Sequence, residues 1–228
     1  MGHMMSKKGQ KLKEKYERIY VALVQQYGEP EWHRSLPPED ELVCTILSQA
    51  TSDTNRDKGF QGLQTGFADW EAVMNAPTEA VREAIFSAGL ANQKAPRIQE
   101  ALRYVFNERG AIDLEWLADL PVDEARAWLT RINGIGLKTA SIIMLFSFGQ
   151  AAFPVDTHVH RITQRVGLIG PKVSATKAHA EMEALAPPRH YYPLHMNLIR
   201  HGREICTARN PKCAICPLQR DCDYYQSL

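Results

Sequence analysis

The stretch from residue 129 to residue 161 carries two side chains that could do covalent chemistry together. It reads LTRINGIGLKTASIIMLFSFGQAAFPVDTHVHR, with Lys138 near the start of an apolar segment and Asp156 just past its end. A neutral lysine amine is a nucleophile, and a carboxylate can stabilise positive charge or assist proton transfer. Lys138 is expected in the first turn of a helix, where the positive end of the helix dipole disfavours the ammonium form. The pair therefore predicts a lysine nucleophile with a carboxylate partner.

A glycine-rich turn, Asn133-Gly134-Ile135-Gly136, comes directly before this segment. Two glycines around one apolar residue allow a tight turn with positive φ. The helix that follows then begins with unpaired N–H groups that face the turn and can bind an anion. We expect this anion to be a DNA phosphate. An ordinary connection between two helices, with glycine as the C-cap, has the same pattern and remains the alternative.

Asp156 also has a simpler interpretation. Residues 153–155 are typical of a short extended segment, and Asp156 or Thr157 can cap a new helix over residues 158–166. A helix cap needs no catalytic role. The spacing alone therefore leaves the two roles of Asp156 open.

Four of the five cysteines lie close together near the end of the chain, with spacing C-x6-C-x2-C-x5-C. Such a group can bind zinc, bind an iron–sulfur cluster or form disulfides, and disulfides are disfavoured in a chain that is not exported. Zinc sites usually contain two CxxC pairs, whereas this group has one. The residues alone leave zinc and a [4Fe–4S] cluster open. The fifth cysteine, Cys44, is expected in the core. The four candidate ligands are Cys206, Cys213, Cys216 and Cys222.

The elements that must position these groups are helices. No sustained alternation of polar and apolar residues indicates a strand, whereas helical periodicity recurs between short Pro, Gly or Asp breaks. We expect an all-α protein, large enough at 228 residues for one large or two modest domains. The expected helices cover residues 10–27, 40–49, 54–62, 70–75, 78–85, 93–109, 114–117, 122–131, 137–148, 158–166, 174–185 and 192–203.

Charge and hydropathy exclude some functions. The net charge is only +1, so any nucleic-acid surface must be local. A membrane span needs a run of about 18 apolar residues, which the chain lacks, and no apolar segment follows the charges at its start. We expect a cytoplasmic protein, associated with the nucleoid if its source is bacterial.

The motifs INGIGLKTA and PVDTHVHR together resemble the endonuclease III family of DNA glycosylases. The resemblance implies that Lys138 forms a Schiff base, that Asp156 is the catalytic aspartate, and that the four cysteines bind a [4Fe–4S] cluster. It departs at Asn133, where many relatives have proline, and at Leu137, where a basic residue is common. These changes put hairpin rigidity and one phosphate contact in question, but not the chemistry.

The resemblance also implies a set of DNA-binding residues. Gln49 matches a glutamine that enters the duplex where the damaged base has left, and Leu90 matches a leucine that inserts beside it. From residue type alone, Leu90 is more often a core contact, so we rank it below Gln49. Thr45 lies where adenine-removing relatives carry a glutamate, which argues against an adenine glycosylase. The other DNA contacts are Gly134, Ile135, Gly136, Thr139, His158 and Arg161.

The implied architecture has two helical domains that flank a DNA-binding cleft. Residues 30–150 form a six-helix domain, and residues 5–29 with 151–228 form the iron–sulfur domain. The implied activity is removal of oxidised pyrimidines from duplex DNA, with strand nicking by β-elimination. Alternatives are a monofunctional thymine or uracil mismatch glycosylase and a non-catalytic iron–sulfur DNA sensor. The partner is double-stranded DNA with damaged bases or abasic sites; we expect a monomer and no membrane.

Overall fold

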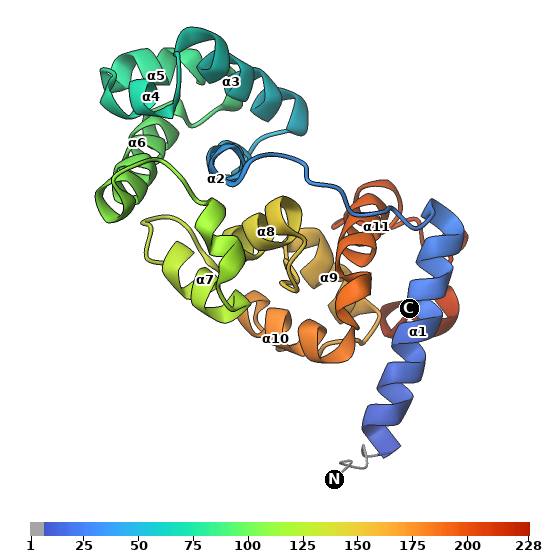
Figure 1. Cartoon of the computed structure of the whole chain (residues 1–228). Coiled ribbons are helices and arrows are strands. Elements are labelled where there is room, and N and C mark those ends of the chain that lie inside the picture. Colours follow the sequence, from blue (N-terminus) through green and yellow to red (C-terminus); the bar gives the residue numbers. More distant parts are fainter. Residues whose placement is uncertain (1–6) are drawn as a thin grey trace. The chain divides into compact units, whose positions relative to one another are not determined.

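A computed structural model describes residues 7–228 of the chain. Residues 1–6, which include the first two positions of the expected segment 5–29, lie outside this description. The described part is helical and contains no strand (Figure 1). This confirms the predicted all-α fold class. None of the described helices is long and apolar enough to cross a membrane.

The chain divides into two compact units, one of them continuous from His33 to Gln150. In this unit α2 packs against α3, α6 and α8, and α7 also packs against α8. Its core helix is α8, whose buried residues include Ala140, Ile143 and Met144. The elements of this unit are α2 (Pro38–Leu47), α3 (Asp53–Gly66), α4 (Trp70–Asn75), α5 (Thr78–Ala84), η1 (Phe86–Ala88), α6 (Ala91–Arg109), η2 (Glu115–Asp119), α7 (Val122–Leu129) and α8 (Leu137–Phe148).

The other unit combines the beginning of the chain, up to Trp32, with Ala151–Leu228. In this unit α11 packs against α1 and α9. The α9–α11 contact depends on Gly202, where an added Cβ would lie 2.9 Å from the Cβ of His158. Its elements are α1 (Lys7–Tyr27), α9 (Thr157–Arg165), α10 (Ala175–Leu185), η3 (Pro188–His190), α11 (Tyr191–Glu204), η4 (Cys213–Ile215), η5 (Gln219–Asp221) and α12 (Asp223–Gln226).

Helix α1 is joined to the carboxyl end of the chain, which lies beside it in Figure 1. Lys15 pairs with Asp223, and Arg18 donates to Asp221 at 2.7 Å. Farther along α1, the Tyr20 ring stacks on His190 with centroids 3.8 Å apart. These contacts join residues more than 150 positions apart, and those of Asp221 and Asp223 attach the end of the cysteine-rich loop to α1.

Most expected helices form, but their ends differ from the prediction. The segment 114–117 is not an α-helix but the 3-10 helix Glu115–Asp119. Helix α2 begins at Pro38 rather than at residue 40, because proline has the backbone angle of a first helical turn and needs no N–H partner there. The short helices η1, η3, η4, η5 and α12 were not expected, since elements this short have no measurable periodicity.

Candidate functional site

The glycine turn before α8 uses its two glycines differently. Gly134 has φ of +83°, as expected, whereas Gly136 is extended with φ of −94° and forms the N-cap of α8. The expectation of positive φ is therefore wrong for Gly136. Ile135 is 4% exposed and its N–H donates to Ile132 at 3.0 Å. Its side chain and amide thus hold the turn in shape, and its contact with DNA remains a prediction.

The first turn of α8 presents free N–H groups. Gly136 supplies no side-chain cap, and the first helical bond runs from the amide of Ala140 to the Gly136 carbonyl at 3.0 Å. Among residues 7–228, no acceptor is found for the amides of Leu137, Lys138 and Thr139. An uncapped helix N-terminus attracts anions through its N–H groups and its dipole.

Lys138 is exposed in this first turn, whereas the next residue, Thr139, is buried. The rest of α8 is apolar core, so the backbone that carries the lysine is rigid. The amine is therefore presented to solvent from a fixed base.

Asp156 is the N-cap of α9. Its Oδ1 accepts from the amide of Val159 at 2.7 Å, and the residue is half-buried. Its second oxygen has no hydrogen-bond donor in the described chain and can act on another group. The structure thus shows Asp156 as a helix cap, and this role occupies only one of its two carboxylate oxygens. Lys138 and Asp156 belong to different units.

The extended segment before Asp156 is held by three side chains of its own unit. The Phe153 amide donates to Glu183 at 2.8 Å, and the Val155 amide donates to a ring nitrogen of His179 at 3.1 Å. His195 lies 3.0 Å from the Pro154 carbonyl. Because Phe153 and Val155 are also buried, the chain segment that leads into Asp156 is rigid.

His158 and Arg161, both expected to contact DNA, lie on α9 and contact each other. The Arg161 guanidinium is 3.1 Å from His158 Nδ1 and donates to the carbonyls of Cys206 and Gly202 at 2.8 and 3.0 Å. These bonds tie α9 to the end of α11 and the start of the cysteine loop. The DNA contacts of both residues remain predictions.

Gln49 and Leu90 lie in two turns of the His33–Gln150 unit. Gln49 is half-buried, and its Oε1 accepts from Arg97 at 3.2 Å. Leu90 is 50% exposed and has the left-handed φ of +50°. The interpretation of Leu90 as a core contact is therefore wrong, because the turn holds its side chain away from the core. The DNA contacts of Leu90 and Gln49 remain predictions.

Thr45 is buried in α2 and its hydroxyl donates to the carbonyls of Glu41 and Leu42 at 2.8 and 2.9 Å. It therefore supplies no acid.

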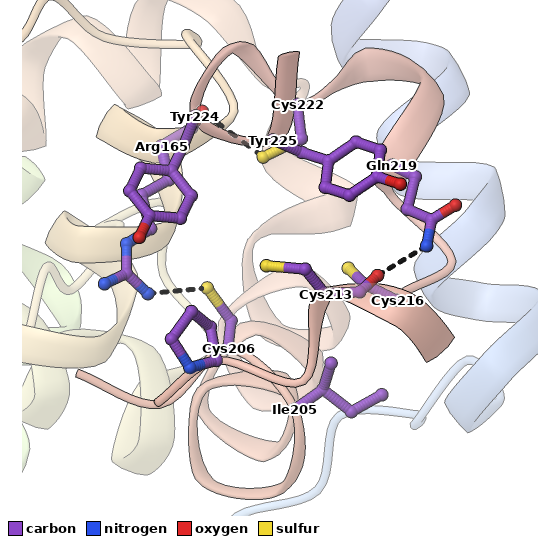
Figure 2. Close-up of a pocket in the computed structure, with 10 residues that line it drawn as sticks. Arg165, Ile205, Cys206, Cys213, Cys216, Gln219, Cys222, Tyr224 and Tyr225 are labelled. Carbon is purple, nitrogen blue, oxygen red and sulfur yellow. Dashed lines mark hydrogen bonds between the residues drawn. The ribbon is translucent and has the colours of Figure 1, made fainter. Parts of the chain in front are cut away.

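The four clustered cysteines line one cavity (Figure 2). Within residues 7–228, no group of three or more His, Cys, Asp or Glu side chains is close enough to hold a single metal ion. Four cysteine thiols around one cavity are the ligand set that a [4Fe–4S] cluster requires. The residues fit a [4Fe–4S] cluster, with Cys206, Cys213, Cys216 and Cys222 as its ligands.

Arg165 supports this loop and was not identified from the sequence. Its guanidinium lies 3.3 Å from the Cys206 sulfur, donates to the carbonyls of Thr207 and Ala208 at 2.8 and 2.9 Å, and stacks on the Tyr224 ring. Figure 2 shows it at the edge of the cavity. Arg165 is 41 positions from Cys206, so no local pattern could connect them. It sets positive charge beside a thiolate ligand.

His201, on α11, contacts one of the cysteines that line this cavity. Its Nε2 lies 3.5 Å from the Cys216 sulfur, and its Nδ1 lies 3.0 Å from the Tyr27 hydroxyl. Burial lowers the pKa of His201 to about 4, so the ring is neutral at physiological pH. Burial also raises the pKa of the Cys216 thiol to about 11, so iron must displace a proton when it binds there.

Taken together, the fold and the site define a helix-hairpin-helix protein with a cysteine-ligated metal loop. Residues 43–188 match the family described as HhH-GPD superfamily base excision DNA repair protein. Residues 206–222 match the iron–sulfur binding domain of endonuclease III. The endonuclease III of Thermotoga maritima is 30% identical over 197 residues, which cover 86% of this chain and 88% of that protein. The chain belongs to the endonuclease III family within the HhH-GPD superfamily, which confirms the resemblance seen in its motifs.

Other relatives are much longer than the chain. The DNA glycosylase/AP lyase ROS1 of Arabidopsis thaliana is 36% identical over 189 residues, which cover 75% of this chain and 13% of ROS1. The matched residues span 57% of another Arabidopsis thaliana relative and 13% of DEMETER-like protein 2 of the same plant. The structure of a non-covalent endonuclease III–DNA complex has the same fold, with a TM-score of 0.81 at 24% identity over 94% of this chain and 97% of that one.

Proposed function

We propose that the protein is a base-excision DNA glycosylase with AP-lyase activity that acts on oxidised pyrimidines in duplex DNA. The observation that carries the proposal is Lys138, an exposed amine in the uncapped first turn of a rigid helix, inside the stretch that matches a base-excision family. A relative named as a DNA glycosylase/AP lyase supports the same activity. We propose that the protein acts in the cytoplasm, at the nucleoid if its source is bacterial.

The amides at the head of α8 bind a phosphate of the damaged strand, and Gly134 and Gly136 let the backbone approach it closely. Thr139 contributes its amide to the same turn. The damaged nucleotide leaves the base stack so that its sugar becomes accessible, and Gln49 and Leu90 fill the space in the duplex. His158 and Arg161 are further candidate contacts to the backbone.

Neutral Lys138 attacks C1′ of the sugar, and the bond from C1′ to the base breaks as the base leaves with its electron pair. The free oxygen of Asp156 stabilises the positive charge that develops on the sugar and assists proton transfer. The C1′–O4′ bond then breaks, which opens the sugar ring and turns the bond between C1′ and the Lys138 nitrogen into a Schiff base. The Schiff base loses a 2′ proton, and β-elimination breaks the C3′–O bond so that the 3′ phosphate leaves with the electron pair. The reaction requires both groups at one nucleotide, so we propose residues 30–150 and 5–29 with 151–228 as its two functional domains.

The [4Fe–4S] cluster, when bound, supplies four iron–thiolate bonds that hold the loop 206–222 together. The chain's own residues then present the basic side chains of this loop to DNA. The reaction needs no redox step, so this role is structural.

Borohydride trapping tests the proposal directly. A duplex with one oxidised pyrimidine should form a stable covalent adduct with the protein, because borohydride reduces the Schiff base. Lys138→Ala should abolish both the adduct and strand nicking, while Lys58→Ala, an exposed lysine on α3, should leave both unchanged. Undiminished trapping by Lys138→Ala would contradict the assignment. Base release without nicking by the unchanged protein would instead support a monofunctional glycosylase, and DNA binding without any base release would support a sensor.

A further inference from the structure

Lys94, on the first turns of α6, is a buried lysine that the proposed reaction does not use. It is 1% exposed, and its ammonium donates to the carbonyl of Leu47 at 2.7 Å and to that of Ala88 at 2.8 Å. No carboxylate lies within ion-pair distance of it in the part of the chain that the structure describes. A buried ammonium without an acidic partner is costly, so its two carbonyl partners must hold it firmly in place.

Each of the two carbonyls lies two residues before a side chain, Gln49 or Leu90, that is proposed to enter the DNA duplex; we call these two side chains the wedges. Leu47 is the last residue of α2 and lies two residues before Gln49, and Ala88 ends η1 two residues before Leu90. The amide of Lys94 also donates to the Leu90 carbonyl at 2.9 Å. The ammonium of Lys94 therefore holds one carbonyl in the turn of Leu90 and one in the turn of Gln49, and the backbone amide closes the first turn of α6 behind Leu90.

The two turns share an unusual backbone. Ala50 and Leu90, with φ of +52° and +50°, are the non-glycine residues with positive φ between residues 7 and 228. This conformation is unfavourable for a residue with a Cβ and persists only where the surroundings impose it. Both residues lie within three positions of a carbonyl that Lys94 binds, so the lysine is placed to impose it.

We propose that Lys94 is a positioning residue that locks the Gln49 and Leu90 turns together, so that both side chains enter a duplex in one step. The inference rests on the proposed function, since it assigns the two side chains to the space left by a flipped nucleotide. It concerns a side chain that touches neither the substrate nor the reacting atoms.

The test compares Lys94→Met with Gln99→Met on the same helix. Gln99 is equally buried, and its amide donates to the carbonyls of Val73, Met74 and Ala76, away from the two turns. Both variants lose buried hydrogen bonds to backbone carbonyls and should lose similar thermal stability. Only Lys94→Met should loosen the Gln49 and Leu90 turns.

The first measurement is excision from a fully paired duplex and from single-stranded DNA with the same lesion. Opening a base pair needs the wedges, whereas a single strand does not, so Lys94→Met should lower the duplex-to-single-strand rate ratio at least tenfold. Gln99→Met should leave the ratio unchanged. Equal ratios in Lys94→Met, Gln99→Met and the unchanged protein would overturn the proposal.

The second measurement needs no DNA and separates this inference from the proposed function. Amide hydrogen exchange of the free protein should accelerate together at residues 47–52 and 86–91 in Lys94→Met, and at 73–77 in Gln99→Met. Acceleration of one turn only would overturn the coupling, even in a protein that excises normally. If exchange accelerates in both turns but the protein cuts no DNA, the positioning role of Lys94 is upheld and the proposed glycosylase activity is refuted. If Lys94→Met does not fold, Lys94→Gln, which keeps two N–H donors on a shorter side chain, should show the same coupled pattern to a smaller extent.

Discussion

The guanidinium of Arg165 lies 3.3 Å from the sulfur of Cys206, and it also donates to the carbonyls of the two residues that follow Cys206 in the chain. An arginine so placed does two things at once. It neutralises charge beside a thiolate ligand, and it closes the backbone of the loop that carries that ligand.

Arg165→Ala should therefore weaken cluster retention. Hydrogen bonds to charged groups contribute about 1.5 to 3 kcal/mol each and are not additive, so the loss of stability should be about 2 to 4 kcal/mol. The measurement is the decay of the visible absorbance of the cluster in the presence of an iron chelator. Arg220→Ala removes an exposed arginine of the same loop and should decay like the unchanged protein. Equal decay of the two variants would show that Arg165 has no special role.

Iron content distinguishes the cluster ligands from the fifth cysteine. Cys216→Ala should lose the cluster, whereas Cys44→Ala should keep about four irons per chain. Burial raises the pKa of the Cys44 thiol to about 12, so it stays protonated and is a poor ligand. Iron and sulfide analysis of the purified proteins measures this. Zinc in place of iron in the anaerobically purified protein would refute the cluster.

Asp156→Asn separates the cap of α9 from catalysis. Asparagine caps a helix about as well as aspartate, so the free energy of unfolding should change by less than about 0.5 kcal/mol. The neutral amide cannot stabilise a cationic sugar, so base excision should slow by at least about 100-fold. Single-turnover kinetics and chemical denaturation measure the two effects. Asp156→Ala, which loses the cap as well, should be about 1 kcal/mol less stable. Unchanged turnover in Asp156→Asn would reduce Asp156 to a cap.

Glu41 makes stability depend on pH. Burial raises its pKa from 4.5 to about 7, with Asp40 adding to the shift and Arg56 opposing it. Between these two values the folded protein holds a proton that the unfolded chain has released, so the free energy of unfolding falls as pH rises through this window. The loss is complete above about pH 7 and is at most about 3 kcal/mol.

Glu41→Gln removes this loss and should unfold at a higher temperature than the unchanged protein at about pH 8. The difference should vanish at about pH 4, where Glu41 is protonated in both states. Thermal denaturation at both pH values measures it. Glu124→Gln, an exposed glutamate on α7, should behave like the unchanged protein at both. An increase in unfolding temperature for Glu41→Gln that is equal at the two pH values would show that the raised pKa of Glu41 is not its cause.

The sequence by itself determined most of the helices and where the candidate groups lie on them. The apolar run 137–148 and the glycine before it place Lys138 in the first turn of α8, and the segment 153–158 makes Asp156 a cap, because both are local patterns of a few residues. The cysteine spacing indicated a metal loop for the same reason.

Only the tertiary structure decided which side chains support these groups. Arg165 reaches Cys206 across 41 positions, and Lys94 reaches Leu47 across 47. Nothing in the local sequence marks either residue as a partner, because the contacts arise when separate helices pack. The exposure of Leu90 is likewise a tertiary outcome, since a left-handed turn between η1 and α6 overrides the tendency of leucine to be buried.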